Sequence, residues 1–178
     1  AFSLPVAFSI LTILMLRMAL HKLPHANMAA SSWLALGPIG TGALGMLLLG
    51  TDAPGIFAAN GLASVGEMAH GLGLIAGITL WGFGLWWMLI AVLITLRYLR
   101  AGIPFNLGWW GFTFPLGVYA LATLKLASLL QLAFFSVFGS VLVVALALMW
   151  LIVAKRTVQG AYKGELFVSP CIAGLANK

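Results

Sequence analysis

The chain has 178 residues, of which 63% are hydrophobic and only 7% are charged. This balance excludes an ordinary soluble domain and is typical of a polytopic membrane protein, because a spanning helix needs about 20 mostly apolar residues. The net charge of +6 does not indicate nucleic-acid binding, since the basic residues lie at the ends of apolar segments and form no basic run with interleaved aromatic residues.

The apolar segments predict an all-α integral membrane protein with a transmembrane domain over residues 1–156 and a tail over 157–178. The predicted spans are about residues 2–20, 32–50, 66–100, 107–127 and 130–154. Polar or proline-containing stretches separate them, and the stretch 51–65, which contains Asp52, Pro54 and Gly55, is predicted as a loop.

Two of the predicted helices contain a proline among small residues. The second reads Gly37-Pro38-Ile39-Gly40-Thr41, and Gly37, Thr41 and Gly45 recur every four positions as a close-packing stripe. The fourth has Pro115 about two turns from its start, where proline removes a backbone donor and kinks a helix. Because the freed backbone group must be satisfied by protein or water, we expect these two helices on the inside and the other three outside.

Helical periodicity places four residues of the fourth segment on one face, namely Phe114, Gly117, Leu121 and Lys125. Such a face would carry a bulky ring at mid-membrane, a small residue beside it and a cation toward one mouth. The alternative is that Phe114 is ordinary packing and that Lys125 extends its amine to the interface.

The charged residues sort onto two sides of the predicted membrane. One side receives Arg17, Lys22, Arg97, Arg100, Lys155, Arg156, Lys163 and Lys178. The other side receives Lys125 together with Asp52 and Glu67. The positive-inside rule therefore predicts a cytoplasmic C-terminus and an external Ala1, an arrangement expected if an odd number of spans precedes this chain.

The remaining polar residues indicate no enzyme, metal site or cofactor. Cys171 is the only cysteine, and Pro24 separates His21 from His25. His70, one turn after Glu67, could form a proton-linked pair, although a solvated helix start explains both residues more simply. We therefore expect no catalytic residue, no metal and no cofactor, and a structural membrane subunit is the alternative to a transport protein.

The stretch from Trp109-Trp110-Gly111-Phe112-Thr113-Phe114-Pro115-Leu116-Gly117 to Thr123 resembles the ninth helix of a known family. This is the tellurite-resistance/dicarboxylate transporter family, which includes bacterial TehA-type proteins, yeast malate transporters and plant slow-type anion channels. Gly37-Pro38-Ile39-Gly40 is similar to its seventh helix. The resemblance covers essentially the whole chain, as spans six to ten of a ten-span protein.

The resemblance implies five helical hairpins in a pseudo-fivefold ring, with odd-numbered helices lining a pore in each subunit of a homotrimer. A phenylalanine occludes the pore; Phe114 matches that position, and Phe112 is the fallback. The implied pore-lining or kink residues are Gly37, Pro38, Thr41, Pro115, Gly117 and Leu121. Lys125 would attract anions, and hydroxyls such as those of Thr41 and Thr113 would favour them.

The implied function is an anion channel or transporter for small inorganic anions or C4-dicarboxylates such as malate, in a bacterial inner membrane. Tellurite resistance belongs to the same family. The expected partners are the lipid bilayer, small anions, two further subunits and the missing N-terminal half of the same protein, but no nucleic acid. A half ring cannot enclose a pore, so this function requires that missing half.

Overall fold

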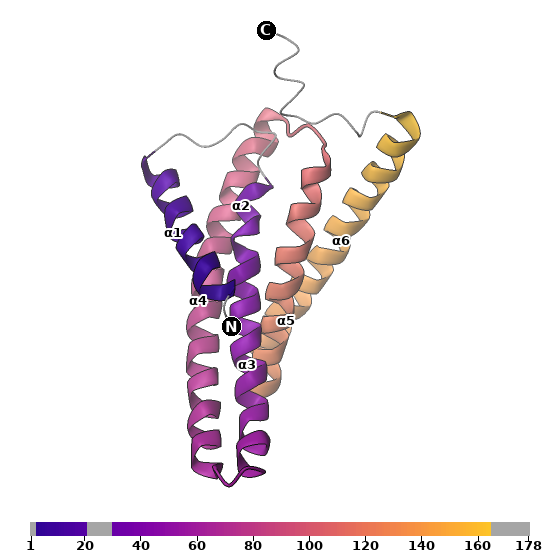
Figure 1. The fold of residues 1–178 in the computed structure, drawn as a ribbon. Coiled ribbons are helices and arrows are strands. Elements are labelled where there is room, and N and C mark those ends of the chain that lie inside the picture. Colours follow the sequence, from indigo (N-terminus) through magenta and orange to yellow (C-terminus); the bar gives the residue numbers. More distant parts are fainter. Residues whose placement is uncertain (1–2, 21–29, 165–178) are drawn as a thin grey trace.

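The computed structural model describes residues 3–20 and 30–164, which are almost entirely helical (Figure 1). The elements are α1 (Ser3–Leu20), α2 (Ser31–Leu34), α3 (Leu36–Ala58), α4 (Ala63–Ala101), the 3₁₀ helix η2 (Leu107–Phe112), α5 (Thr113–Leu130) and α6 (Ala133–Lys163). His21, His25 and Cys171 lie outside the described residues.

Four helical stretches are long and apolar enough to cross a membrane: Ser31–Ala58, Ala63–Arg100, Leu107–Leu130 and Ala133–Lys163. Helix α1 adds a shorter apolar stretch, Leu4–Arg17. These lengths agree with the predicted class of an all-α integral membrane protein, since about 20 residues span the hydrocarbon core.

The long helices alternate in direction, so that α3 and α5 run one way and α4 and α6 return (Figure 1). Helix α3 packs along both α4 and α5, whereas the backbones of α4 and α5 come near each other at few positions, so the lateral order is α4, α3, α5, α6. The two helices that start with a proline segment are therefore neighbours at the centre of the described bundle.

The ends of α1, α4 and α6 lie toward the same end of the bundle (Figure 1). Those ends carry the described basic residues Arg17, Arg97, Arg100, Lys155, Arg156 and Lys163. Asp52 and Glu67 lie near the opposite turn between α3 and α4. The arrangement agrees with the charge separation in the sequence, and the cytoplasmic side itself stays a prediction.

Both prolines sit at the third position of their α-helix, Pro38 in α3 and Pro115 in α5. The first N–H groups of a helix have no acceptor within it, so proline costs little there. A kink at Pro115 within the apolar helical stretch Leu107–Leu130 stays a prediction. Regular α-helical hydrogen bonding is interrupted just before each proline, at Ala35 between α2 and α3 and at the passage from η2 to α5. Each interruption lies beside the carbonyl four residues before the proline, which proline leaves without a backbone donor.

The predicted loop over 51–65 is largely wrong, because α3 continues to Ala58 with Pro54 inside it and α4 already begins at Ala63. Pro54 has no N–H to donate to the Gly50 carbonyl four residues earlier. The Nδ1 atom of His70 lies 2.9 Å from that carbonyl oxygen. Since a carbonyl only accepts hydrogen bonds, Nδ1 carries the proton and replaces the missing backbone donor.

Glycines on α4 allow its backbone to touch that of α3. A Cβ added at Gly73 would lie 2.6 Å from the Met46 carbonyl oxygen, and one at Gly66 would lie 2.9 Å from Cα of Pro54. This close approach brings His70, which lies between the two glycines, within reach of Gly50. Small residues perform this role in membrane helix pairs, where burial of apolar surface alone gives no preference for protein over lipid.

A buried hydrogen-bond network joins α4 to α5. The hydroxyl of Tyr119 donates to the Trp81 carbonyl, and the Trp81 indole Nε1 donates to the hydroxyl of Thr123, each at 2.8 Å. The Thr123 hydroxyl in turn donates to the Tyr119 carbonyl, so the buried polar side chains of the network are satisfied.

Helix α6 continues to Lys163, nine residues beyond the predicted end of the fifth span. The predicted span ended before Lys155 and Arg156 because charged residues are costly in a membrane, and Lys163 was assigned to the tail. A helix can extend past the apolar core into water, so these residues mark the end of the span but not of the helix.

We predict that His70→Ala lowers stability and that Pro54→Ala restores most of it in the double variant, since alanine supplies the N–H that Gly50 needs. An unsatisfied buried carbonyl costs about 1–3 kcal/mol. The measurement is the thermal unfolding midpoint of the full-length protein in detergent, for both single variants and the double variant. If His70→Ala lowers the unfolding midpoint by the same amount in the wild-type and the Pro54→Ala backgrounds, the assignment of the His70–Gly50 hydrogen bond is contradicted.

Candidate functional site

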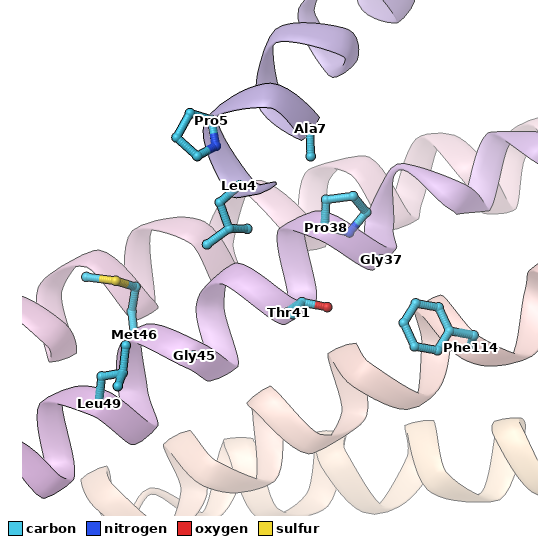
Figure 2. A pocket seen from close by; sticks show the side chains of 10 residues that line it. All are labelled: Leu4, Pro5, Ala7, Gly37, Pro38, Thr41, Gly45, Met46, Leu49 and Phe114. Carbon is cyan, nitrogen blue, oxygen red and sulfur yellow. The ribbon is translucent and has the colours of Figure 1, made fainter. Parts of the chain in front are cut away.

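An open groove with a volume of about 750 Å³ lies between α1, α3 and α5 (Figure 2). It is lined by Leu4, Pro5, Ala7, Gly37, Pro38, Thr41, Gly45, Met46, Leu49 and Phe114. Most of the lining comes from one face of α3, while α1 supplies one wall and Phe114 of α5 stands at one end. The groove therefore contains several of the residues that the sequence singled out.

The ring of Phe114 lies against Gly37. A Cβ added at Gly37 would lie 3.3 Å from Cε1 of Phe114 and 3.9 Å from Cγ of Pro115. Phe114 is nevertheless 65% exposed, because its ring projects past α3 into the groove. A large apolar side chain of α5 thus lies outside the core of this chain, against α3.

The close contact continues one turn further along both helices. A Cβ added at Gly40 would lie 3.1 Å from the Tyr119 backbone nitrogen and 3.4 Å from the Val118 carbonyl carbon. Helices α3 and α5 therefore meet at backbone distance over this turn. Gly37 and Gly40 set how near Phe114 comes to the wall of the groove.

Phe112 has a different environment from Phe114. It is 2% exposed, and its ring makes edge-to-face contacts with Trp33 at 5.7 Å and with Trp109 at 5.8 Å between ring centroids. Phe112 is a core residue and does not line the groove. Of the two phenylalanines, only Phe114 can contact a solute in the groove.

Hydrogen bonds and ring contacts fix the starts of α3 and α5. The Trp33 indole donates to Thr95 of α4, and the Trp87 indole donates to the Ser32 carbonyl, each at 2.9 Å. The Asn106 side chain accepts from the Gly108 N–H at 2.8 Å and caps η2. The groove is thus built on restrained helix starts.

The Arg156 guanidinium of α6 lies 5.3 Å from the Trp109 ring centroid and 6.0 Å from that of Phe105. This cation–π contact holds the segment before α5 against the end of α6. Sequence reasoning missed it, because Arg156 was assigned only to the charged end of a span. The one available signal was that Arg156 and the Trp109-Trp110 pair both lie at ends of apolar segments that face the same side of the predicted membrane.

The structure separates the other residues predicted to line a pore. Pro38 and Thr41 line the groove, whereas Pro115 is buried against α3. Gly117 turns toward α6, where an added Cβ would lie 3.4 Å from Leu146, so it does not share the groove with Phe114. Sequence spacing places Gly117 about 60° away from Phe114 around the helix, and α6 occupies that direction.

Leu121 and Lys125 lie further along α5, beyond the groove. Leu121 is 56% exposed, and Lys125 is half-buried. The Lys125 side chain makes no hydrogen bond or ion pair with any residue the structure describes. Its predicted effect on anions therefore stays a prediction.

The predicted alternative role of His70 is replaced by a structural one, since its ring bonds the Gly50 carbonyl. Across residues 3–20 and 30–164, no group of three or more His, Cys, Asp or Glu side chains is arranged to hold a metal ion. Sequence reasoning also missed Leu4, Pro5 and Ala7 in the wall of the groove, because ordinary apolar residues carry no signal of their neighbours.

Residues 1–158 match the SLAC1 family, which is described as voltage-dependent anion channels. The chain belongs to the SLAC1 family. This membership confirms the resemblance to TehA-like transporters and covers every described helix except the last turns of α6.

Two fungal SLAC1 relatives are sulfite efflux pumps. The pump SSU1 of Arthroderma otae is 36% identical over 167 residues, which are 93% of this chain and 44% of that protein. The SSU1 of Trichophyton rubrum is 35% identical with the same coverage. An uncharacterized transporter of Methanocaldococcus jannaschii is 31% identical over 160 residues, 89% of this chain and 44% of that protein.

This chain therefore spans less than half the length of the curated relatives it matches. No solved structure matches it significantly. The groove is accordingly a surface of part of a SLAC1-family protein.

We predict that Gly37→Val displaces the Phe114 ring, because the added side chain would occupy the space against which that ring lies. Gly45→Val is the matched control, since Gly45 lines the same groove and a Cβ there meets nothing within 4 Å. The measurement is fluorine NMR of 4-fluorophenylalanine at position 114 in the full-length protein. The resonance should move in Gly37→Val only; an unmoved resonance would show that Gly37 does not position the ring.

Proposed function

We propose that the complete protein moves small anions across a membrane along a path that includes the groove between α1, α3 and α5, and that the Phe114 ring occludes this path. The observation that carries the proposal is the position of Phe114, 65% exposed from its own chain and lying over Gly37 at one end of the groove. Membership in a family of anion channels and transporters supplies the class of substrate.

The lining of the groove supports passage rather than tight binding. It holds small residues, apolar side chains and one hydroxyl, with no charged side chain among the described lining residues. A fixed cation at mid-membrane would be costly and would hold an anion strongly. Basic residues at the ends of the helices, with Lys125 on the opposite side, would instead raise the local anion concentration.

The choice of Phe114 rather than Phe112 as the occluding residue follows from burial. Moving the Phe112 ring would break its contacts with Trp33 and Trp109. The Phe114 ring can leave Gly37 with little loss of buried surface. A gate needs two arrangements that differ by only a few kcal/mol, and a half-free ring satisfies that condition.

The path requires further protein on the open side of the groove. We propose that the missing N-terminal half of the same protein covers it and that the complete protein forms a homotrimer in the lipid bilayer, with the C-terminus in the cytoplasm. A bacterial inner membrane stays the predicted location. A structural membrane subunit without its own pore is the alternative, and a flux measurement separates the two.

The substrate we propose first is sulfite, because the fungal relatives carry the name of sulfite efflux pumps. C4-dicarboxylates such as malate were the expectation from sequence and form the second class to be tested, and tellurite resistance would be a consequence of the same path. Sulfite carries its charge on a few atoms and is small enough to pass a ring that has only partly turned aside.

We predict that Phe114→Ala increases anion flux several-fold in proteoliposomes that contain the full-length protein, because the occluding ring is gone. Phe134→Ala is the control, since Phe134 is also exposed, at 57%, but lies on α6 outside the groove lining. Unchanged flux in a correctly assembled Phe114→Ala protein would contradict the occlusion. No flux in any variant would favour the structural subunit.

We predict further that the wild-type protein carries radiolabelled sulfite faster than radiolabelled malate under equal gradients, because the larger dianion must displace the Phe114 ring further. Uptake into proteoliposomes measures both rates, and empty vesicles give the background. Faster malate entry would assign the protein to the dicarboxylate branch of the proposal instead.

A further inference from the structure

Thr41 differs from every other threonine in the chain. The others donate their hydroxyl hydrogen to a backbone carbonyl three or four residues earlier in the chain. They are Thr12, Thr51, Thr79, Thr95, Thr113, Thr123 and Thr157. The Thr41 hydroxyl makes no hydrogen bond to any residue in the described ranges 3–20 and 30–164.

The Thr41 hydroxyl points into the groove, toward the side on which Phe114 lies (Figure 2). Gly37 and Gly45, one turn before and one turn after it, leave the hydroxyl uncovered on its own helix. A hydroxyl that faces lipid normally bonds back to its own helix, because hydrocarbon offers no partner. The free hydroxyl is therefore available to water or to a polar solute in the groove.

Thr41 is also the single hydrogen-bonding side chain among the groove residues that the structure describes. The others are glycine, proline, alanine, leucine, methionine and phenylalanine. Thr113, the other hydroxyl that the sequence suggested, is unavailable because it donates to the Trp110 carbonyl at 2.9 Å. An anion in the groove would thus meet one side-chain donor.

We propose that the Thr41 hydroxyl donates a hydrogen bond to the passing anion and favours small oxyanions over halides. This inference rests on the proposed function, because it requires that anions enter the groove. A charged oxygen accepts a short and strong hydrogen bond from a hydroxyl. Chloride is larger than the oxygen atom of an oxyanion, so it accepts a longer and weaker hydrogen bond from the same hydroxyl.

The arrangement makes Thr41 a specificity-determining residue distinct from the occluding ring. Phe114 controls whether the groove is open, through its position on Gly37. Thr41, one turn further along α3, determines for which anion a hydrogen bond best offsets the loss of hydration free energy on entering the groove. The two roles predict different changes, in total flux for Phe114 and in the ratio between anions for Thr41.

The test measures sulfite and chloride flux in proteoliposomes that contain the full-length protein with Thr41→Val, which keeps the shape but removes the hydroxyl. Losing one hydrogen bond should reduce sulfite flux about threefold to tenfold and change chloride flux less. Thr41→Ser keeps the donor and should retain the wild-type ratio. Thr79→Val is the matched control, because Thr79 is exposed on α4 and its hydroxyl is bonded to the Ile75 carbonyl.

The outcomes separate this inference from the proposed function. If neither the wild-type protein nor Phe114→Ala carries sulfite, chloride or malate, the proposed function fails. If the wild-type protein carries both and Phe114→Ala raises flux, an unchanged sulfite-to-chloride ratio in Thr41→Val overturns the role of Thr41 alone. An equal loss of both anions overturns it as well. Thr41→Ala gives the same comparison if Thr41→Val does not fold.

Discussion

The close contact between α3 and α5 at Gly37 and Gly40 is the constraint on which the rest of the site depends. These helices run in the same direction, and their backbones approach because neither glycine carries a side chain. The contact buries Pro115, turns Phe114 into the groove and leaves Thr41 facing the same space. A larger residue at either glycine would separate the helices and remove the wall against which the ring lies.

The contact persists because the starts of both helices are held elsewhere. Trp33 and Trp87 fasten α2 to α4, and Arg156 holds Trp109 from the end of α6. Aromatic residues can do this at a membrane boundary, since each ring buries apolar area while its N–H or a cation satisfies the polar contact. The groove thus lies beside helix starts that are held by side-chain contacts, and the Phe114 ring at one end of it is 65% exposed.

The α3–α4 hairpin follows a second rule of membrane proteins, that every backbone group needs a partner. Pro54 breaks this rule within α3, and His70 of α4 repairs it across the hairpin at 2.9 Å. The repair needs Gly66 and Gly73 on either side of His70, because they bring the backbones together. A histidine that resembles a functional group in the sequence is therefore part of the scaffold that positions the groove.

The sequence by itself determined the class, the family and the apolar segments, and it singled out Gly37, Thr41 and Phe114 as candidates, because apolar length, helical spacing and the proline motifs are local properties. Only the tertiary structure decided which of these residues share a surface. The sequence predicts that Pro54 breaks the helix, and only the structure shows that His70 supplies a donor to the Gly50 carbonyl. The sequence also predicts that Gly117 shares a face with Phe114, and only the structure shows that α6 packs against Gly117. The choices between Phe112 and Phe114, and between Thr113 and Thr41, depended on burial and on hydrogen bonds to other parts of the fold. Residue spacing along one helix cannot reveal those partners, since they come from neighbouring helices and from the breaks before α3 and α5.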